Sequence, residues 1–202
     1  MILRGQLHAH TTMSDGRLTP QETADEYARL GFHFLAITDH DHLLRPTYRD
    51  EIKNIKSDLL IFPGIELTVH CSKGYVHVSR IDGNGDDLFI LNHPADYDLD
   101  LRKTMECIEE VSAQYPLHAV EITNHGFYTP EFDIPEINYL KIAADDSHNR
   151  LGCGRGWIEL ESELSGKAIM TAIKSGKYRN CFAGNLGQKE IMSRQVPEFR
   201  LA

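Results

Sequence analysis

The sequence lacks three features that would place it in common classes of protein. Its four cysteines form no Cys-x-x-Cys pair and have no regular spacing, which argues against both a zinc ribbon and a disulfide framework. No apolar run approaches the length of a membrane span, and the N-terminus lacks the basic region and apolar core of a signal peptide. These absences predict a reduced, cytoplasmic, soluble protein with no membrane partner.

The chain also lacks an excess of positive charge. It has 30 acidic and 21 basic residues and a formal net charge of −9, so an extended nucleic acid is a disfavoured partner. Bound divalent ions would change that balance locally. At 202 residues and 41% hydrophobic, the chain predicts one domain over 1–202, and its oligomeric state is not indicated.

Short apolar runs alternate with helical patterns along the chain. Thr19, Pro20 and Glu22 form a capping box with proline at the first helical position, and Gly31 is placed to end that helix. Periodic apolar residues predict further helices at 45–57, 100–115 and 166–175. Short apolar runs predict strands at 1–7, 34–38, 59–62, 75–79, 88–91, 119–122, 139–144 and 157–160. This order favours an α/β fold, a (β/α) barrel, with an open doubly wound sheet as the alternative.

The most informative stretch is His8-Ala-His10, which follows the first apolar run. Two histidines at positions i and i+2 of a strand point to the same face and can converge on one ion. Asp15 lies beyond a Ser-Asp-Gly turn and could reach back as an oxygen ligand. Taken alone, a His-x-His pair is also typical of a surface loop.

Similar polar side chains recur at the ends of the predicted strands. Burying so many ionisable groups requires an opposite charge, and divalent cations are the obvious partner. The collected donors, which predict a metal site at the carboxyl ends of the strands, are His8, His10, Asp15, His40, Glu66, His77, His93, Asp146 and His148.

These motifs, in this order, resemble the PHP (polymerase and histidinol phosphatase) family of metal-dependent phosphoesterases. The resemblance covers residues from 3 to about 184. It implies a distorted seven-stranded (β/α) barrel, TIM-like, with two to three divalent ions at its mouth. In the ligand sets that it implies, one ion is held by His8, His10, Glu66 and Asp146, a second by Glu66, His77 and His93, and a third by Asp15, His40 and His148.

The implied chemistry is hydrolysis of a phosphate ester by a metal-activated hydroxide at a trinuclear site. Imidazole and carboxylate donors suit zinc, manganese or iron equally. Glu66 and Asp146 are the expected catalytic ligands, and Asp39 is a candidate proton acceptor or, equally, a turn residue. Arg155 and Arg17 could bind phosphate from loops, although a solvated loop arginine is the commoner case.

Several functions remain open at this point. The leading hypothesis is a phosphoesterase whose partner is a small phosphorylated metabolite or nucleotide, with monoesters preferred over diesters. A nuclease or nucleotide phosphodiesterase, an amidohydrolase-type metal hydrolase and a non-catalytic metal-binding module are the alternatives. His125 has no defensible role, while Phe127 and Tyr128 could line a substrate pocket or simply pack.

Overall fold

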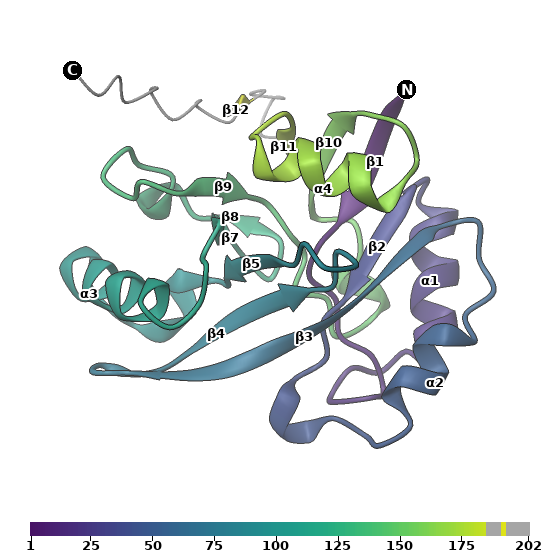
Figure 1. Cartoon of the computed structure of the whole chain (residues 1–202), viewed down its shortest axis with the longest axis horizontal. Helices are drawn as coiled ribbons and strands as arrows, with labels where there is room; N and C mark the ends of the chain where they lie inside the picture. The colour runs from purple at the N-terminus through teal and green to yellow at the C-terminus, as the bar shows by residue number, and fades with distance from the viewer. Residues whose placement is uncertain (185–190, 193–202) are drawn as a thin grey trace.

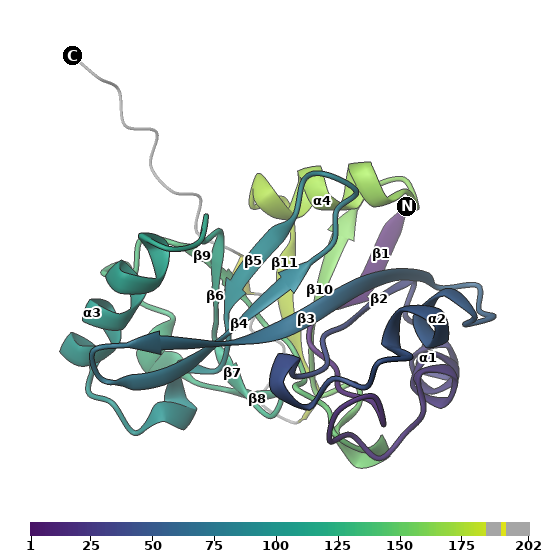
Figure 2. The same ribbon diagram turned by 60° about the horizontal axis from the view of Figure 1, so that its bottom comes forward.

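The computed structural model describes residues 1–184 and 191–192, and most of its strands belong to one curved, barrel-like sheet (Figures 1 and 2). The described strands follow one another in space in the order β12 (Ile191–Met192), β11 (Arg179–Phe182), β10 (Gly156–Glu161), β1 (Ile2–Gln6), β2 (Phe34–Ile37), β3 (Leu60–Cys71), β4 (Gly74–Ile81), β5 (Leu88–Leu91), β6 (Ala119–Glu121) and β9 (Leu140–Ile142). A separate two-stranded hairpin is formed by β7 (Thr123–Asn124) and β8 (Phe127–Tyr128).

The direction of the strands explains why the polar motifs meet. β1, β2 and β3 are parallel to one another, and so are β5, β6 and β9. β4 is antiparallel to both β3 and β5, so the two parallel groups run the same way. The carboxyl ends of these six strands therefore lie on one rim of the sheet, where residues far apart in sequence become neighbours.

Four α-helices of the described chain lie outside the sheet: α1 (Pro20–Arg29), α2 (Tyr48–Lys53), α3 (Leu101–Ser112) and α4 (Gly166–Lys174). Ile169 and Ile173 of α4 are fully buried and share a cluster with Leu3 of β1. In both views α4 lies beside the start of β1, at the opposite end from the rim that carries the motifs (Figures 1 and 2). None of these helices combines the length and apolar character that a bilayer span needs.

Two buried side-chain amides add hydrogen bonds where the backbone ladders end, and that of Asn180 links two strands that no ladder joins. Asn180 of β11 accepts a hydrogen bond from the N–H of Ala143 (2.8 Å) and donates one to the carbonyl of Lys141 (2.9 Å), which connects β11 to β9. Gln6 accepts from the N–H of His8 (3.1 Å) and donates to the carbonyl of Gly156 (2.9 Å). These bonds satisfy backbone groups that would otherwise be buried without partners, and those of Asn180 nearly close the sheet.

The sequence predicted the mixed α/β class and most element positions, including the capping box of Thr19 and Glu22 at the start of α1. One strand was predicted too short: β3 extends to Cys71, so Glu66 lies inside it rather than at its end. The cause is the antiparallel partner β4, which pairs with β3 from Gly64 onward. The seven-strand count of a regular barrel is not confirmed, and the expected domain over 1–202 includes residues 185–190 and 193–202, which lie outside the described residues.

Candidate metal centre

The His8-Ala-His10 segment leaves β1 where the Gln6 side chain redirects the backbone. Gln6 Oε1 accepts hydrogen bonds from the N–H groups of Leu7 (2.9 Å) and His8 (3.1 Å). Both histidines are 1% exposed, and their Nε2 atoms lie 3.0 Å apart. Two imidazole nitrogens so close together need either a proton or a cation between them.

The turn that carries Asp15 folds back over His10 and is held by Asp39. Asp39 accepts hydrogen bonds from Thr11 N (2.8 Å), Thr11 Oγ1 (2.7 Å) and Ser14 Oγ (2.6 Å). Gly16 is required here, because a Cβ atom would lie 2.6 Å from the backbone of His10. The Asp39 carboxylate is thus occupied by the turn, which supports the turn-residue interpretation over the proton-acceptor one.

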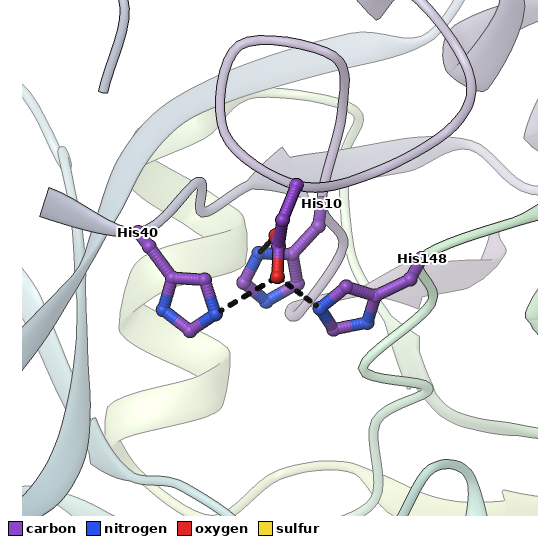
Figure 3. A group of neighbouring side chains, drawn as sticks. His10, His40 and His148 are labelled. Carbon is purple, nitrogen blue, oxygen red and sulfur yellow. Dashed lines mark ion pairs between the residues drawn. The ribbon is translucent and has the colours of Figure 1, made fainter. Parts of the chain in front are cut away.

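Asp15 lies among three histidines from separate segments. One carboxylate oxygen is 3.5 Å from His10 Nδ1, and the other is 3.6 Å from His40 Nε2 and 3.3 Å from His148 Nε2. Figure 3 shows the His10, His40 and His148 rings surrounding a common point. His40 follows β2 and His148 follows β9, so this group exists only because the strand ends share one rim.

Glu66 is fully enclosed within the cluster, with 0% exposure. Both of its oxygens face imidazoles, at distances of 2.9–3.4 Å. Oε1 lies near His8 Nε2, His93 Nε2 and His77 Nδ1, and Oε2 lies near His10 Nε2 and His40 Nδ1. Asn92 Nδ2 also donates to Oε1 at 2.7 Å, which fixes the carboxylate from behind.

Asp146 contacts His8 and His10, which also contact Glu66. Its Oδ1 lies 3.1 Å from His10 Nε2 and 3.4 Å from His8 Nε2, and its Oδ2 lies 3.1 Å from His125 Nδ1. Three non-glycine residues here have positive φ: His93 (25°), His125 (48°) and Asp146 (48°). Such strained backbone persists where the surrounding structure holds it, which is common at functional sites.

The donors fit divalent ions, because several buried atoms of the cluster lack hydrogen-bond partners. Among the described residues these include His10 Nδ1, His40 Nδ1, Glu66 Oε2, His77 Nδ1, His93 Nδ1 and Asp146 Oδ1. His40 Nδ1 and Glu66 Oε2 are only 2.9 Å apart, yet they are not aligned as a hydrogen bond. Buried polar atoms are normally satisfied, so this pattern indicates lone pairs reserved for cations.

The structure brings all nine predicted ligands together, in groups that resemble the predicted sets. Donor atoms mutually within 4.8 Å form the groups His8–His10–Glu66, His10–Asp15–His40–His148, His40–Glu66–His77 and His125–Asp146–His148. His93 belongs to none of these four groups of described residues, although its Nε2 is 3.2 Å from Glu66. His125 was not predicted, and it sits beside Asp146 at a tight turn.

A second residue that the sequence motifs missed is Glu121, which is fully buried at the end of β6. Its Oε2 lies 3.0 Å from His8 Nδ1 and accepts a hydrogen bond from the N–H of His93 (3.3 Å). Since a carboxylate accepts, the proton of His8 is placed on Nδ1, and Nε2 is left for an ion. The available signal was an acidic residue inside the apolar run 119–122.

The charges of the metal-free cluster are strongly coupled. Burial lowers the pKa of His10, but the adjacent carboxylates of Asp146 and Glu66 raise it by more, to about 9. His8 behaves in the same way, and its pKa lies well above the ordinary value. Burial raises the pKa of Glu66, but the surrounding histidines lower it by more, so that it lies well below the ordinary value. In this state, protons occupy the places that cations would take.

A cavity of about 270 Å³ opens beside Asp146, and Arg155 lines it. The other lining residues are His125, Asp145, His148, Asn149 and Gly152. Arg17, the second predicted phosphate ligand, is exposed and contributes its backbone N–H to the carbonyl of His148 (2.8 Å). Among the described residues its guanidinium makes no hydrogen bond or ion pair with the cluster, whereas Arg155 lines the cavity.

Comparison with known proteins agrees with this arrangement. The family model described as the PHP domain matches residues 6–181. The chain belongs to the PHP domain family. A two-domain protein from Bacteroides vulgatus, which contains a predicted PHP-like metal-dependent phosphoesterase, has the same fold with a TM-score of 0.67 and 20% identity, over 90% of this chain and 65% of that one.

Other relatives match shorter parts of this PHP domain. The 5'-3' exoribonuclease Rnm of Salmonella typhimurium is 37% identical over 73 residues, which are 36% of this chain and 25% of that protein. The error-prone DNA polymerase of Mycobacterium tuberculosis is 55% identical over 44 residues, 21% of this chain and 4% of the polymerase. An amidohydrolase from Chromobacterium violaceum shares the fold, with a TM-score of 0.55 and 15% identity, over 72% of this chain and 87% of that one. The chain thus spans about a quarter of the length of the exoribonuclease.

Replacing Asp15 with alanine should weaken one ion selectively. Asp15 contacts His10, His40 and His148 but not Glu66, so the ions around Glu66 keep their ligands. We expect the affinity for the ion held by Asp15, His40 and His148 to fall by more than roughly 10–100-fold, the loss caused by removing a residue that only orients a ligand. Elemental analysis after dialysis measures this. Asp15→Ala should lose about one equivalent, and loss of every ion to the same extent as in His77→Ala would contradict separate positions.

The stability of the metal-free protein should fall as the pH rises. The pKa of His10 is raised to about 9, so its stabilisation is complete below about 6.5 and disappears as the pH passes about 9. Metals compete with these protons, so the increase in Tm caused by metal should grow over the same interval. Thermal unfolding of chelator-treated and metal-loaded protein at pH 6.5 and pH 9 tests this. A metal-induced increase that stays constant or shrinks would contradict it.

Proposed function

We propose that this PHP domain is a metal-dependent phosphoric ester hydrolase that acts on a small phosphorylated compound. The observation that carries the proposal is the carboxylate of Glu66, which is fully buried between five imidazoles. Two of those imidazoles, His8 and His10, also contact Asp146, which lines the cavity. A purely structural acid would not need so many titratable partners. Membership of the PHP family supports the same reaction class.

Two to three divalent ions fit the donors. His8, His10, Glu66 and Asp146 would hold one, Glu66 with His77 and His93 a second, and Asp15 with His40 and His148 a third. Imidazole with carboxylate suits zinc, manganese or iron. When bound, such ions acidify water and neutralise negative charge on phosphoryl oxygens.

The protein's own residues position the reacting groups. Glu66 would keep two ions at a fixed separation, because its two oxygens face different histidines. Glu121 keeps His8 in one tautomer, and Asp39 keeps the Asp15 turn in place. Arg155, on the wall of the cavity, is the candidate to bind a phosphate oxygen, since its guanidinium offers several donors in a plane.

The size and charge of the site favour small substrates with a terminal phosphate. A cavity of about 270 Å³ lies at the lower end of the roughly 300–1,000 Å³ typical of ligand pockets. A monoester carries up to two charges and a diester only one, so clustered cations attract the monoester more strongly. The second candidate is a nuclease or nucleotide phosphodiesterase, which the similarity to the exoribonucleases from Salmonella and Escherichia coli favours.

A substrate panel with Glu66→Gln as the inactive variant tests the function. Glutamine has nearly the same volume but no charge, so it cannot bridge two cations, and kcat/KM should fall by more than roughly 100-fold. Glu161→Gln, at an exposed position of β10, is the matched control and should keep full activity.

The parent protein should hydrolyse phosphomonoesters faster than the corresponding diesters at equal metal loading. Cleavage of oligonucleotides or diesters with no activity on monoesters would transfer the assignment to the second candidate. Near-normal activity of Glu66→Gln on any substrate that the parent cleaves would contradict the bridging role.

A further inference from the structure

Phe127 is an exposed aromatic residue at the edge of the candidate metal centre. The residue is 64% exposed and lies on the two-stranded hairpin of β7 and β8. His125 (φ 48°) and Gly126 (φ 79°) form the two-residue turn of this hairpin. Positive φ at both turn residues is typical of a tight type I′ connection, which fixes the direction of the flanking strands. The turn places Phe127 two residues from His125, whose ring contacts Asp146.

The position of Phe127 is held by its neighbours. The Arg155 guanidinium carbon lies 4.9 Å from the centre of the Phe127 ring, and Arg155 Nη1 donates to the carbonyl of His125 (3.3 Å). A Cβ atom at Gly126 would lie 2.4 Å from Arg155 Cβ, so only glycine permits this close packing. The backbone N–H of Arg155 donates to Asp145 Oδ1 (2.7 Å), which anchors the backbone of Arg155.

The adjacent aromatic residue, Tyr128, packs against the protein instead. Its ring lies 5.0 Å from that of Phe182, and its hydroxyl donates to Asp133 Oδ2 (2.8 Å). Packing therefore accounts for Tyr128 but not for Phe127, which keeps most of its surface in solvent. An ordered, exposed aromatic ring beside a polar cavity is suited to contact a flat ligand group.

Arg155 connects the aromatic ring to the cavity. It lines the cavity together with Asp146 and His148, and it also lies over Phe127. At about 270 Å³ the cavity can enclose a phosphate and part of a sugar, but a group attached beyond the sugar would emerge at its rim. Phe127 does not line the cavity itself, but its ring packs against the guanidinium of Arg155, which does.

We propose that Phe127, supported by Arg155, is a stacking surface for the nucleobase of a nucleoside monophosphate unit whose phosphate occupies the cavity lined by Asp146, His148 and Arg155. This inference rests on the proposed phosphoesterase function and narrows its substrate class from phosphorylated compounds in general to nucleotides. Stacking on an aromatic ring is tolerant of base identity, because every base has a flat face. The site should therefore select nucleotides over sugar phosphates without strong preference among bases.

Equilibrium binding separates stacking from turnover. The metal-loaded protein is titrated calorimetrically with the non-hydrolysable phosphonate analogue of adenosine 5′-monophosphate and with the matching ribose phosphonate, which lacks the base. We expect the nucleotide analogue to bind about tenfold more tightly, which corresponds to about 1.4 kcal/mol and to the lower part of the range for base–aromatic stacking. Phe127→Ala should remove this difference and leave ribose phosphonate binding unchanged, while Phe127→Trp should keep it.

Tyr75→Ala is the matched control, because Tyr75 is equally exposed (67%) but lies on the β3–β4 hairpin; it should keep the difference. Three results would overturn the stacking role. The parent could bind the two analogues equally, the difference could survive in Phe127→Ala, or that variant could weaken the binding of both ligands equally. Selective binding without hydrolysis of any phosphoester would contradict the proposed function alone. Hydrolysis of both substrate types with equal binding would contradict stacking alone, and no binding of either analogue would contradict both.

Discussion

The buried carboxylate of Glu66 requires positively charged groups beside both of its oxygens, and much of the molecule is arranged to supply them. A solitary ionised acid at 0% exposure would be strongly destabilising. Five histidines surround it, from the segments after β1, β2 and β5 and from within β4. Only a sheet whose parallel strands end on one rim can collect these side chains, so the requirement for cations and the strand directions are two aspects of one constraint.

Buried polar residues around the cluster hold its ligands in place through short hydrogen bonds. Gln6 directs the chain toward His8, Asp39 holds the turn that carries Asp15, and Asn92 and Glu121 contact Glu66 and His8 directly. None of these four residues needs to touch substrate. Their role is to keep the donor atoms of the ligands in place, so the ordered part of the site extends beyond the ligands themselves.

The ligand residues could be predicted from the sequence because each follows or interrupts an apolar run, and because their motifs occur in a family order. Glu121 occupies the same kind of run but belongs to no recognised motif, so its role became visible only through its distance to His8. The length of β3 was underestimated, because its pairing with β4 is not encoded in the local pattern around Pro63 and Gly64. Likewise, the contrast between exposed Phe127 and packed Tyr128 depends on Arg155 and Phe182, which are distant in sequence.

The number of metal ions bound per chain tests the central claim most directly. If the buried donors exist to hold cations, protein produced with ample metal and then dialysed should retain more than one equivalent of zinc, manganese or iron by elemental analysis. One ion cannot satisfy both oxygens of Glu66 together with the separate group around Asp15. Retention of at most one equivalent would contradict the account.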